Sequence, residues 1–207
     1  MKNLFLTSYF AGTAELFQNY FEGRTVKRKV LFVPTAGKVE EYNLYVEEAM
    51  NAFEALEFEI DVLDVSAIDE KAAKEKISDT ECLYISGGNT FYLLQELKKK
   101  HLIGVIRGKI NEGMIYIGES AGAIIASPSI EYNQIMDDKS IATELSSYDA
   151  LGVVDFYVLP HYNEFPFEET ADKTKEVYGK ELRLLPINNS EAVIVSGDTY
   201  KVIKNRC

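Results

Sequence analysis

The sequence predicts an α/β protein with a doubly wound, mostly parallel sheet that carries helices on both faces. Three observations lead to this prediction. Short apolar segments alternate with helix-like segments from the start of the chain to about residue 126, which is typical of strand–helix–strand units. Residues 30–33 are apolar at consecutive positions, as strands buried on both faces are. Two apolar segments run directly into glycine-containing turns, at Gly87 and at Gly118.

The first part of the chain gives a regular succession of elements. A strand is expected to end at Ala11-Gly12, after which Thr13 is a candidate N-cap and Gly23 closes the helix. Consecutive apolar residues, period-2 alternation and helical periodicity then distinguish the later strands from the helices. The expected strands are 3–10, 29–34, 59–65, 81–86 and 114–117, and the expected helices are 14–21, 40–58, 70–77, 91–97 and 101–111.

The pattern loosens after residue 126. Residues 132–148 are polar and predict a loop or short irregular structure, and residues 153–159 predict a further strand. An acidic loop and a helix are expected within residues 165–179. Residues 191–196 and 199–204 form an expected hairpin, since Gly197-Asp198 suits a tight turn between two strands. We find no linker or change in composition, so we expect one domain over residues 1–207.

The composition excludes several classes of protein. The 207 residues include 22 Lys and Arg against 33 Asp and Glu, a net charge of −11, which argues against binding to nucleic acids or to anionic membranes. No apolar run approaches the roughly 20 residues that span a bilayer, and the N-terminus does not resemble a signal peptide. Cys82 is expected in the core and Cys207 is the last residue, so a reducing, cytoplasmic location is expected. We expect no cofactor and no metal ion.

The segment Gly118-Glu119-Ser120-Ala121-Gly122 is the strongest functional signal. An apolar strand leads into it and a helix of small residues follows, which is the setting of a nucleophile elbow. Glycine at both flanking positions avoids collisions at the sharp turn, and the turn presents the Ser120 hydroxyl at a helix N-terminus. The alternative is a tight turn in which Ser120 only caps the helix.

Two other segments are expected at the same edge of the sheet, because ligand sites lie outside the carboxyl ends of parallel strands. Gly87-Gly88-Asn89 follows one strand and could bring backbone N–H groups close to a substrate. Alternatively, it is a plain turn with Asn89 or Thr90 as N-cap. His161 follows another strand and is the best candidate base for Ser120.

A Ser-His pair also needs a carboxylate that fixes the tautomer of the imidazole. Asp137 and Asp138 lie between Ser120 and His161 in the polar loop. We predict that Asp137 has this role, with Asp138 as the second choice. The alternative is that both are solvated residues of a turn.

These residues resemble the serine peptidase family of α-aspartyl dipeptidase (peptidase E) and cyanophycinase. The resemblance covers residues 30–165 and is carried by residues 87–91, 118–123 and 160–163. It implies a class I glutamine amidotransferase-like fold, Ser120 as nucleophile, His161 as base, and the N–H groups of Gly88 and Ala121 as oxyanion donors.

Two departures from the family pattern affect this interpretation. The position of the family's acidic triad member is Ile135 here, so the role must pass to Asp137 or Asp138. The family's arginine for the substrate carboxylate is also absent, and Lys173 and Lys175 are the nearest cations. A lysine supplies a point charge but not the two-pronged contact of an arginine.

We therefore predict a cytoplasmic serine peptidase that hydrolyses short peptides, with N-terminal aspartate as the candidate specificity. The substrate is expected to be a small peptide, and the chain is expected to be a monomer or a homodimer. An esterase or amidase with the same triad is the second hypothesis. A binding or sensor protein that has lost the chemistry is the third.

Overall fold

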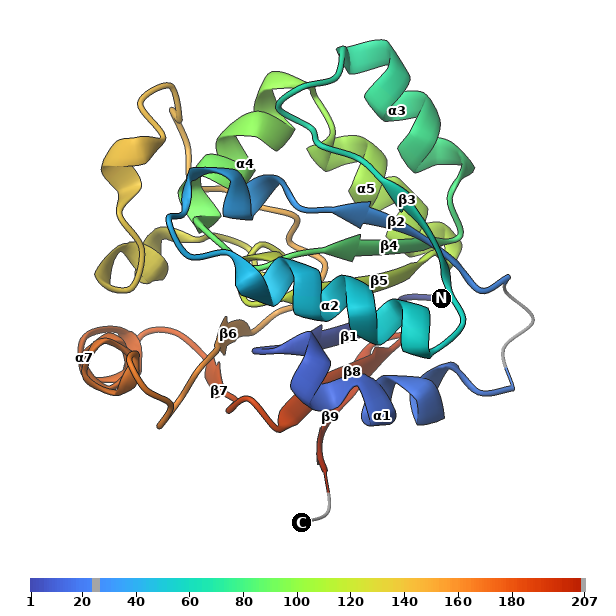
Figure 1. Ribbon diagram of the computed structural model, residues 1–207. Coiled ribbons are helices and arrows are strands. Elements are labelled where there is room, and N and C mark those ends of the chain that lie inside the picture. Colours follow the sequence, from blue (N-terminus) through green and yellow to red (C-terminus); the bar gives the residue numbers. More distant parts are fainter. Residues whose placement is uncertain (24–26, 206–207) are drawn as a thin grey trace.

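The central feature of the fold is a seven-stranded sheet with the order β3-β2-β4-β5-β1-β8-β9, seen edge-on in Figure 1. The computed structural model describes residues 1–23 and 27–205. The predicted α/β class is confirmed. The strands of this sheet are β1 (Asn3–Thr7), β2 (Lys29–Val33), β3 (Glu59–Val62), β4 (Cys82–Ile85), β5 (Ile115–Glu119), β8 (Glu191–Ser196) and β9 (Thr199–Lys204).

The first five of these strands run parallel, and β8 joins β1 in the antiparallel direction. Thr7 at the end of β1 is therefore level both with Glu119 at the end of β5 and with Ala192 near the start of β8. As a result, the residues just before β8 lie at the same edge of the sheet as the carboxyl ends of the parallel strands. The hairpin of β8 and β9 has the predicted bounds.

A separate two-stranded parallel sheet pairs β6 (Tyr157–Leu159) with β7 (Leu184–Pro186). The predicted strand 153–159 is wrong in its first four residues, because only the last three pair with a partner. The strand β7 was not predicted, because three partly buried residues give no periodic signal. Its backbone bonds to β6 come from residues distant in sequence.

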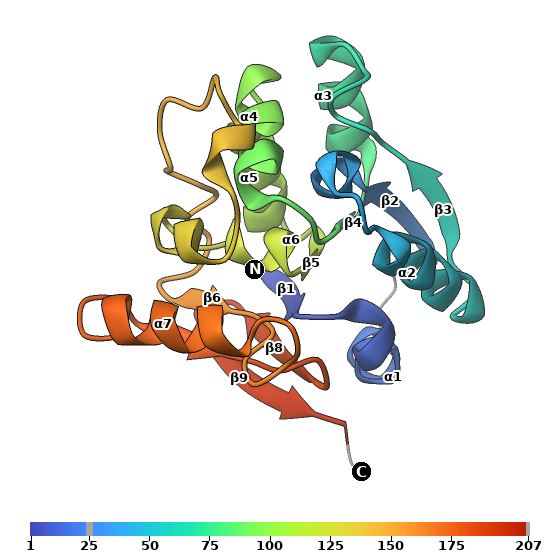
Figure 2. The same ribbon diagram turned by 60° about the vertical axis from the view of Figure 1, so that its left-hand side comes forward.

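The helices α1 to α6 form two layers, and α7 lies apart from them beside β6 (Figure 2). In one layer, α1 and α2 contact each other and cover one face; α3, α4, α5 and α6 cover the other. Their bounds are α1 (Phe10–Phe21), α2 (Leu44–Ala55), α3 (Glu70–Asp79), α4 (Thr90–Lys99), α5 (Ile103–Glu112), α6 (Ala121–Ile124) and α7 (Glu168–Tyr178), with short 3-10 turns η1 (Thr35–Val39), η2 (Glu131–Ile135) and η3 (Lys139–Ile141).

Two helix starts differ from their predictions. The helix α1 begins at Phe10 rather than near residue 14, so Thr13 is not the N-cap. Its buried hydroxyl instead bonds Thr7 Oγ1 at 3.0 Å. The helix α2 begins at Leu44 rather than at residue 40, since the η1 turn takes up residues 35–39 and residues 40–43 are not helical. Hydrophobic periodicity alone does not locate these boundaries.

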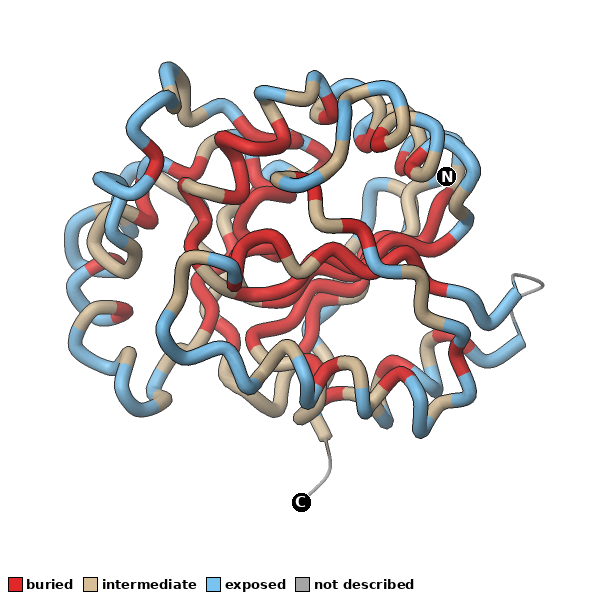
Figure 3. Tube along the Cα trace, turned by 45° about the horizontal axis from the view of Figure 1, so that its top comes forward, coloured by how far each residue is buried: buried red, intermediate tan, exposed pale blue. Residues whose placement is uncertain are grey.

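Each face of the sheet has its own apolar cluster. The central strands β2, β4, β5 and β1 are buried along most of their length, whereas the edge strands β3 and β9 contain no buried residue (Figure 3). The α1–α2 face is rich in aromatic rings, and Phe10 stacks on Phe53 with ring centroids 4.3 Å apart. Cys82 is a free thiol in this cluster, whereas Cys207 lies outside the described residues. Within residues 1–23 and 27–205, no helix combines the length and the apolar character needed to cross a bilayer.

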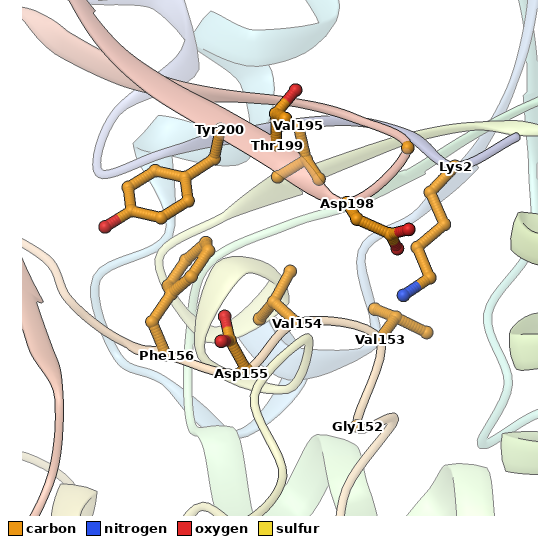
Figure 4. A pocket seen from close by; sticks show the side chains of 11 residues that line it. Lys2, Gly152, Val153, Val154, Asp155, Phe156, Val195, Asp198, Thr199 and Tyr200 are labelled. Carbon is orange, nitrogen blue, oxygen red and sulfur yellow. The ribbon is translucent and has the colours of Figure 1, made fainter.

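Figure 4 shows a cavity of about 330 Å³ between the loop of residues 152–156 and the β8–β9 turn. Lys2, Asp155 and Asp198 are among the side chains that line it. Lys2 precedes β1 and Asp198 follows β8, so this cavity lies at the amino end of β1. None of the predicted site residues lines it, because they follow the carboxyl ends of the parallel strands.

Candidate active site

Ser120 lies on a strained turn between β5 and α6. Its backbone angles are φ 46° and ψ −104°, a conformation that residues other than glycine rarely adopt. A Cβ atom on Gly118 would lie 2.4 Å from the carbonyl oxygen of Gly122, and one on Gly122 would lie 2.2 Å from that of Ile85. Both flanking glycines are therefore required by close backbone contacts. The Ser120 side chain makes no capping hydrogen bond to α6, contrary to the alternative interpretation.

The Ser120 hydroxyl instead contacts His161. The distance from Ser120 Oγ to His161 Nε2 is 3.0 Å, which is within hydrogen-bond reach for a nucleophile and its base. His161 follows β6 and has φ 56°. Its backbone N–H donates to Ser8 Oγ at 3.0 Å, and its ring stacks on Phe167 at a centroid distance of 4.6 Å. The imidazole is thus fixed by its own backbone and by a neighbouring ring.

The other ring nitrogen faces an amide rather than a carboxylate. His161 Nδ1 lies 2.8 Å from Oδ1 of Asn189. An amide oxygen accepts only, so this contact assigns the ring proton to Nδ1 and leaves Nε2 as the acceptor for the Ser120 hydroxyl. Ser120, His161 and Asn189 therefore form one continuous chain of hydrogen bonds.

Asn189 is held in place by the loop between β7 and β8. Its backbone N–H donates to Glu164 Oε1 at 3.2 Å. The backbone of Gly12 approaches so closely that a Cβ there would lie 2.5 Å from the Asn189 carbonyl oxygen. This loop reaches the site because β8 is antiparallel and begins at the catalytic edge of the sheet.

Asp137 does not occupy the predicted place beside His161. Its Oδ2 accepts hydrogen bonds from the backbone N–H of Thr90 and from Nδ2 of Asn133, both at 2.8 Å. Thr90 is the first residue of α4, so the carboxylate lies at a helix N-terminus, where a negative charge is favoured. Burial nevertheless raises the pKa of Asp137 to about 6.

Asp138 is also engaged elsewhere. Its side chain accepts from the backbone N–H of Ser140 at 2.8 Å and caps the η3 turn. Its carbonyl oxygen accepts from Nδ2 of Asn89. The prediction of Asp137, or of Asp138 in its place, as the partner of His161 is therefore corrected to Asn189.

Gly87, Gly88 and Asn89 lie next to the nucleophile, but with different roles in the fold. Gly88 has φ 123°, and a Cβ there would lie 2.2 Å from the backbone of Ala36. A Cβ on Gly87 would come within 3.3 Å of Ser120 Cβ. Asn89 caps α4 through its Oδ1, which accepts from the Tyr92 N–H at 2.9 Å. With its Nδ2 also bonded, the Asn89 side chain serves the loop itself, and Gly88 and Ala121 remain the candidate oxyanion donors.

Burial governs the ionisation of the groups in the site. It lowers the pKa of His161, against the opposing effects of Asn189 and Glu164. The imidazole is therefore neutral near pH 7, as a base requires. Burial also raises the pKa of Glu119, the residue before the nucleophile, to about 7.

The two lysines considered for substrate recognition lie on α7. Lys175 Nζ donates to the hydroxyl of Tyr162 at 3.0 Å and lies 4.7 Å from the centre of its ring. Tyr162 adjoins His161 in sequence, but both lysines are exposed to solvent.

The fold and the Ser-His-Asn hydrogen-bond chain define a serine hydrolase of the α/β type with a nucleophile elbow. The particular family follows from the sequence. Residues 4–203 match peptidase family S51, so the chain belongs to that family and is a serine-type peptidase.

Similar proteins occur in several bacteria. The chain is 45% identical over 204 residues to the uncharacterized peptidase PM1590 of Pasteurella multocida, covering 99% of this chain and 98% of that one. It is 28% identical over 205 residues to a peptidase E of Salmonella arizonae, covering 91% and 84%. A crystal structure from Listeria monocytogenes EGD-e, provisionally named a peptidase E protein, covers both chains completely with TM-score 0.93 and 42% identity.

Proposed function

We propose that this peptidase cleaves short peptides through an acyl-enzyme formed on Ser120, with His161 as base and Asn189 as the group that orients it. The observation that carries the proposal is the chain of hydrogen bonds from Ser120 Oγ through both ring nitrogens to Asn189 Oδ1. The proposal includes a cytoplasmic location, which the acidic charge and the unpaired Cys82 support.

The reaction follows from the positions of these atoms. His161 Nε2 takes the hydroxyl proton as Ser120 Oγ attacks the scissile carbonyl, and the N–H groups of Gly88 and Ala121 stabilise the oxyanion. The imidazolium then gives its proton to the leaving amine, which departs with the new N–H bond. Water hydrolyses the acyl-enzyme with His161 acting as base again. Asn189 keeps the proton on Nδ1 throughout, but it supplies no charge to stabilise the imidazolium.

A preference for N-terminal aspartate has little support in this site. Lys175 is exposed and already bound to Tyr162. Burial raises the pKa of the Tyr45 hydroxyl, and three carboxyl groups, those of Glu40, Glu119 and Asp137, raise it further. A Cβ on Gly87 would lie 3.5 Å from the Tyr45 ring, so Tyr45 lies beside residues 87–89, which we call the oxyanion loop. This concentration of acidic groups disfavours an anionic substrate side chain. We therefore propose peptides without an acidic first residue as the preferred class.

The first test is covalent labelling of Ser120. A fluorophosphonate probe should label the wild type, and Ser120→Ala should abolish both labelling and hydrolysis, because an alanine has no nucleophile. The loss of turnover should be about 10⁴-fold or more. Equal labelling of the alanine variant would remove Ser120 from the mechanism, and absence of labelling in the wild type would favour a binding or sensor protein of this fold.

The second test concerns the substrate. We expect kcat/KM for Leu-Leu to equal or exceed that for Asp-Leu, with Lys175→Ala changing the ratio by less than about threefold, as for an exposed charge. A wild type that prefers Asp-Leu and loses the preference in Lys175→Ala would instead establish aspartyl specificity. Hydrolysis of simple esters without that of any dipeptide would favour the esterase alternative.

A further inference from the structure

Glu119 is a fully buried carboxyl group that the proposed reaction does not use. It lies at the end of β5, 2% exposed and directly before Ser120. Burying a carboxylate is costly unless its oxygens are satisfied by hydrogen bonds. Here Oε1 accepts from the backbone N–H of Phe10 at 3.1 Å, and Oε2 accepts from the hydroxyl of Tyr84. The backbone N–H of Gly87 is a third donor.

These donors belong to the segments that make up the active site. Gly87 begins the oxyanion loop and adjoins Gly88. Phe10 is the first residue of α1 and follows the turn that contains Ser8, whose hydroxyl accepts from the backbone N–H of His161 at 3.0 Å. Glu119 itself is attached to Ser120. One carboxylate thus contacts the nucleophile turn, the oxyanion loop and the segment that anchors the base.

We propose that Glu119 is a positioning residue: its carboxylate holds the oxyanion loop and the β1–α1 turn in register with Ser120, and its protonation releases them. The inference rests on the proposed function of Ser120 and adds a second ionisation to the control of the same site. Glu119 does not touch the reacting atoms, so it acts only through the segments that it joins.

The hydrogen-bond pattern favours the charged form for activity. Three donors face Glu119, and bonds to a carboxylate are roughly twice as strong as those to a neutral group. A protonated Glu119 must donate, and the facing oxygen is that of Tyr84, whose own hydrogen then has to turn away. The bonds from Phe10 and Gly87 weaken at the same time.

The surroundings place this ionisation near neutral pH. Burial raises the pKa of Glu119 to about 7, against the lowering effect of its three donors, and the charge of Glu48 on α2 raises it slightly further. The other titratable groups that face it are the phenols of Tyr84 on β4, Tyr45 on α2 and Tyr9 before α1. These phenols all have raised pKa values and stay neutral near pH 7, so the carboxyl is the group that changes charge.

The experiment measures the rate of fluorophosphonate labelling between about pH 5 and 9. In the wild type the rate should be half-maximal near pH 7. In Glu119→Gln the acidic limb of this pH–rate profile should move below pH 6.5, because the groups that still titrate do so at lower pH. His161 has a lowered pKa, and the pKa of Asp137 is about 6. The plateau rate should fall about 10- to 100-fold, since an amide cannot accept from all three donors and the oxyanion loop shifts.

Tyr84→Phe gives the opposite displacement. It removes one donor to the carboxylate, so the pKa of Glu119 should rise and the acidic limb should move above that of the wild type. Tyr132→Phe is the matched control, since it removes a buried hydroxyl that bonds Val158 rather than Glu119. In Tyr132→Phe the labelling rate should be half-maximal at the same pH as in the wild type.

Opposite displacements in the two variants support the proposal, and Tyr84→Phe alone decides it if Glu119→Gln does not fold. An unchanged limb, or displacement of both limbs in the same direction, overturns it and leaves Glu119 a structural residue. Absence of labelling in the wild type is a different result, because it removes the proposed function of Ser120 itself.

Discussion

The least expected residue of the site is Asn189, which stands where a carboxylate was predicted. An amide oxygen can fix the imidazole tautomer by accepting from Nδ1, as in Cys-His-Asn peptidases. It carries no charge, so it stabilises the imidazolium that forms during attack less than a carboxylate would. Burial keeps the pKa of His161 low, although the hydrogen bond to Asn189 raises it, and the result is a weaker but neutral base.

Substitution of Asn189 should separate orientation from charge. Asn189→Ala removes the acceptor at Nδ1, and we expect kcat to fall about 10²-fold or more, because the reactive tautomer is no longer selected. Asn189→Asp keeps the acceptor and adds a negative charge. The pKa of His161 should then rise by about one unit or more, since a nearby opposite charge favours the imidazolium.

The measurement is an NMR titration of the imidazoles, which is simple because the chain has two histidines and His101→Gln identifies the signal of the other. Asp137→Asn is the matched control, because Asp137 bonds Thr90 and Asn133 instead. It should leave the titration of His161 unchanged. A shift in this control as large as that in Asn189→Asp would restore Asp137 as the electrostatic partner.

The sequence predicted the pairing of Ser120 with His161, but not their third partner. The serine has a local signal in its flanking glycines, and the histidine follows a strand whose apolar end is recognisable. Asn189 has neither, because it was brought to the site by the antiparallel direction of β8. The available signal was an asparagine in the loop just before β8, which begins at the edge of the sheet where the parallel strands end. A search limited to carboxylates does not find it.

The β5–α6 turn depends on backbone contacts that exclude side chains. A Cβ on Gly122 would lie 2.2 Å from the Ile85 carbonyl oxygen, which is shorter than any relaxed contact. The turn therefore has to move away from β4, and Ser120 with it. By contrast, a Cβ on Gly108 in the middle of α5 would meet no atom within 4 Å.

These two glycines predict opposite effects of the same substitution. Gly122→Ala should lower the free energy of unfolding by about 1–3 kcal/mol, as overpacking does, and should also slow labelling of Ser120. Gly108→Ala should raise it by about 0.5–1 kcal/mol, because alanine favours the helix. Urea denaturation of both variants measures the difference. Stabilisation by Gly122→Ala would contradict the close packing of the turn against β4.

The sequence predicts most accurately the bounds of those elements whose residue periodicity and turn residues both lie in one short segment. The β8–β9 hairpin was exact in its bounds because alternation and a tight turn agree. The prediction of a strand over residues 153–156 was wrong, because an apolar segment does not always have a neighbouring strand to pair with. These residues contribute to the core instead, with Val153 and Phe156 buried beside β6. Pairing between distant segments is not encoded in any window of the sequence.

For the whole molecule, the buried carboxyl groups link stability to pH. The pKa of Glu119 is raised from about 4.5 to about 7 in the folded state, and that of Asp137 from 3.8 to about 6. The folded protein thus holds protons that the unfolded chain has released. The stability contributed by each group is fully present below its unfolded pKa and is lost as the pH rises through its folded pKa. The net charge of −11 acts in the same direction through self-repulsion.

His161 acts in the opposite sense, since its lowered folded pKa reduces stability as the pH falls below about 6.5. A comparison of Glu119→Gln with the wild type cancels this effect and that of Asp137. The glutamine at position 119 does not ionise. The free energy of unfolding of this variant, relative to that of the wild type, should therefore increase from about pH 5 to pH 8. One pKa unit corresponds to about 1.4 kcal/mol, and the gain should be on the order of 1–3 kcal/mol.

Stability and activity should therefore change in opposite directions over the same pH range. The charged form of Glu119 is the one that holds the oxyanion loop, yet it is also the form that burial penalises. Urea denaturation of the wild type and of Glu119→Gln at pH 5.5 and 8, beside labelling rates at the same pH values, measures both. A difference in unfolding free energy that does not vary with pH would mean that Glu119 in the folded protein does not change its charge between pH 5.5 and 8 as proposed. Its protonation could then not release the active-site loops near neutral pH.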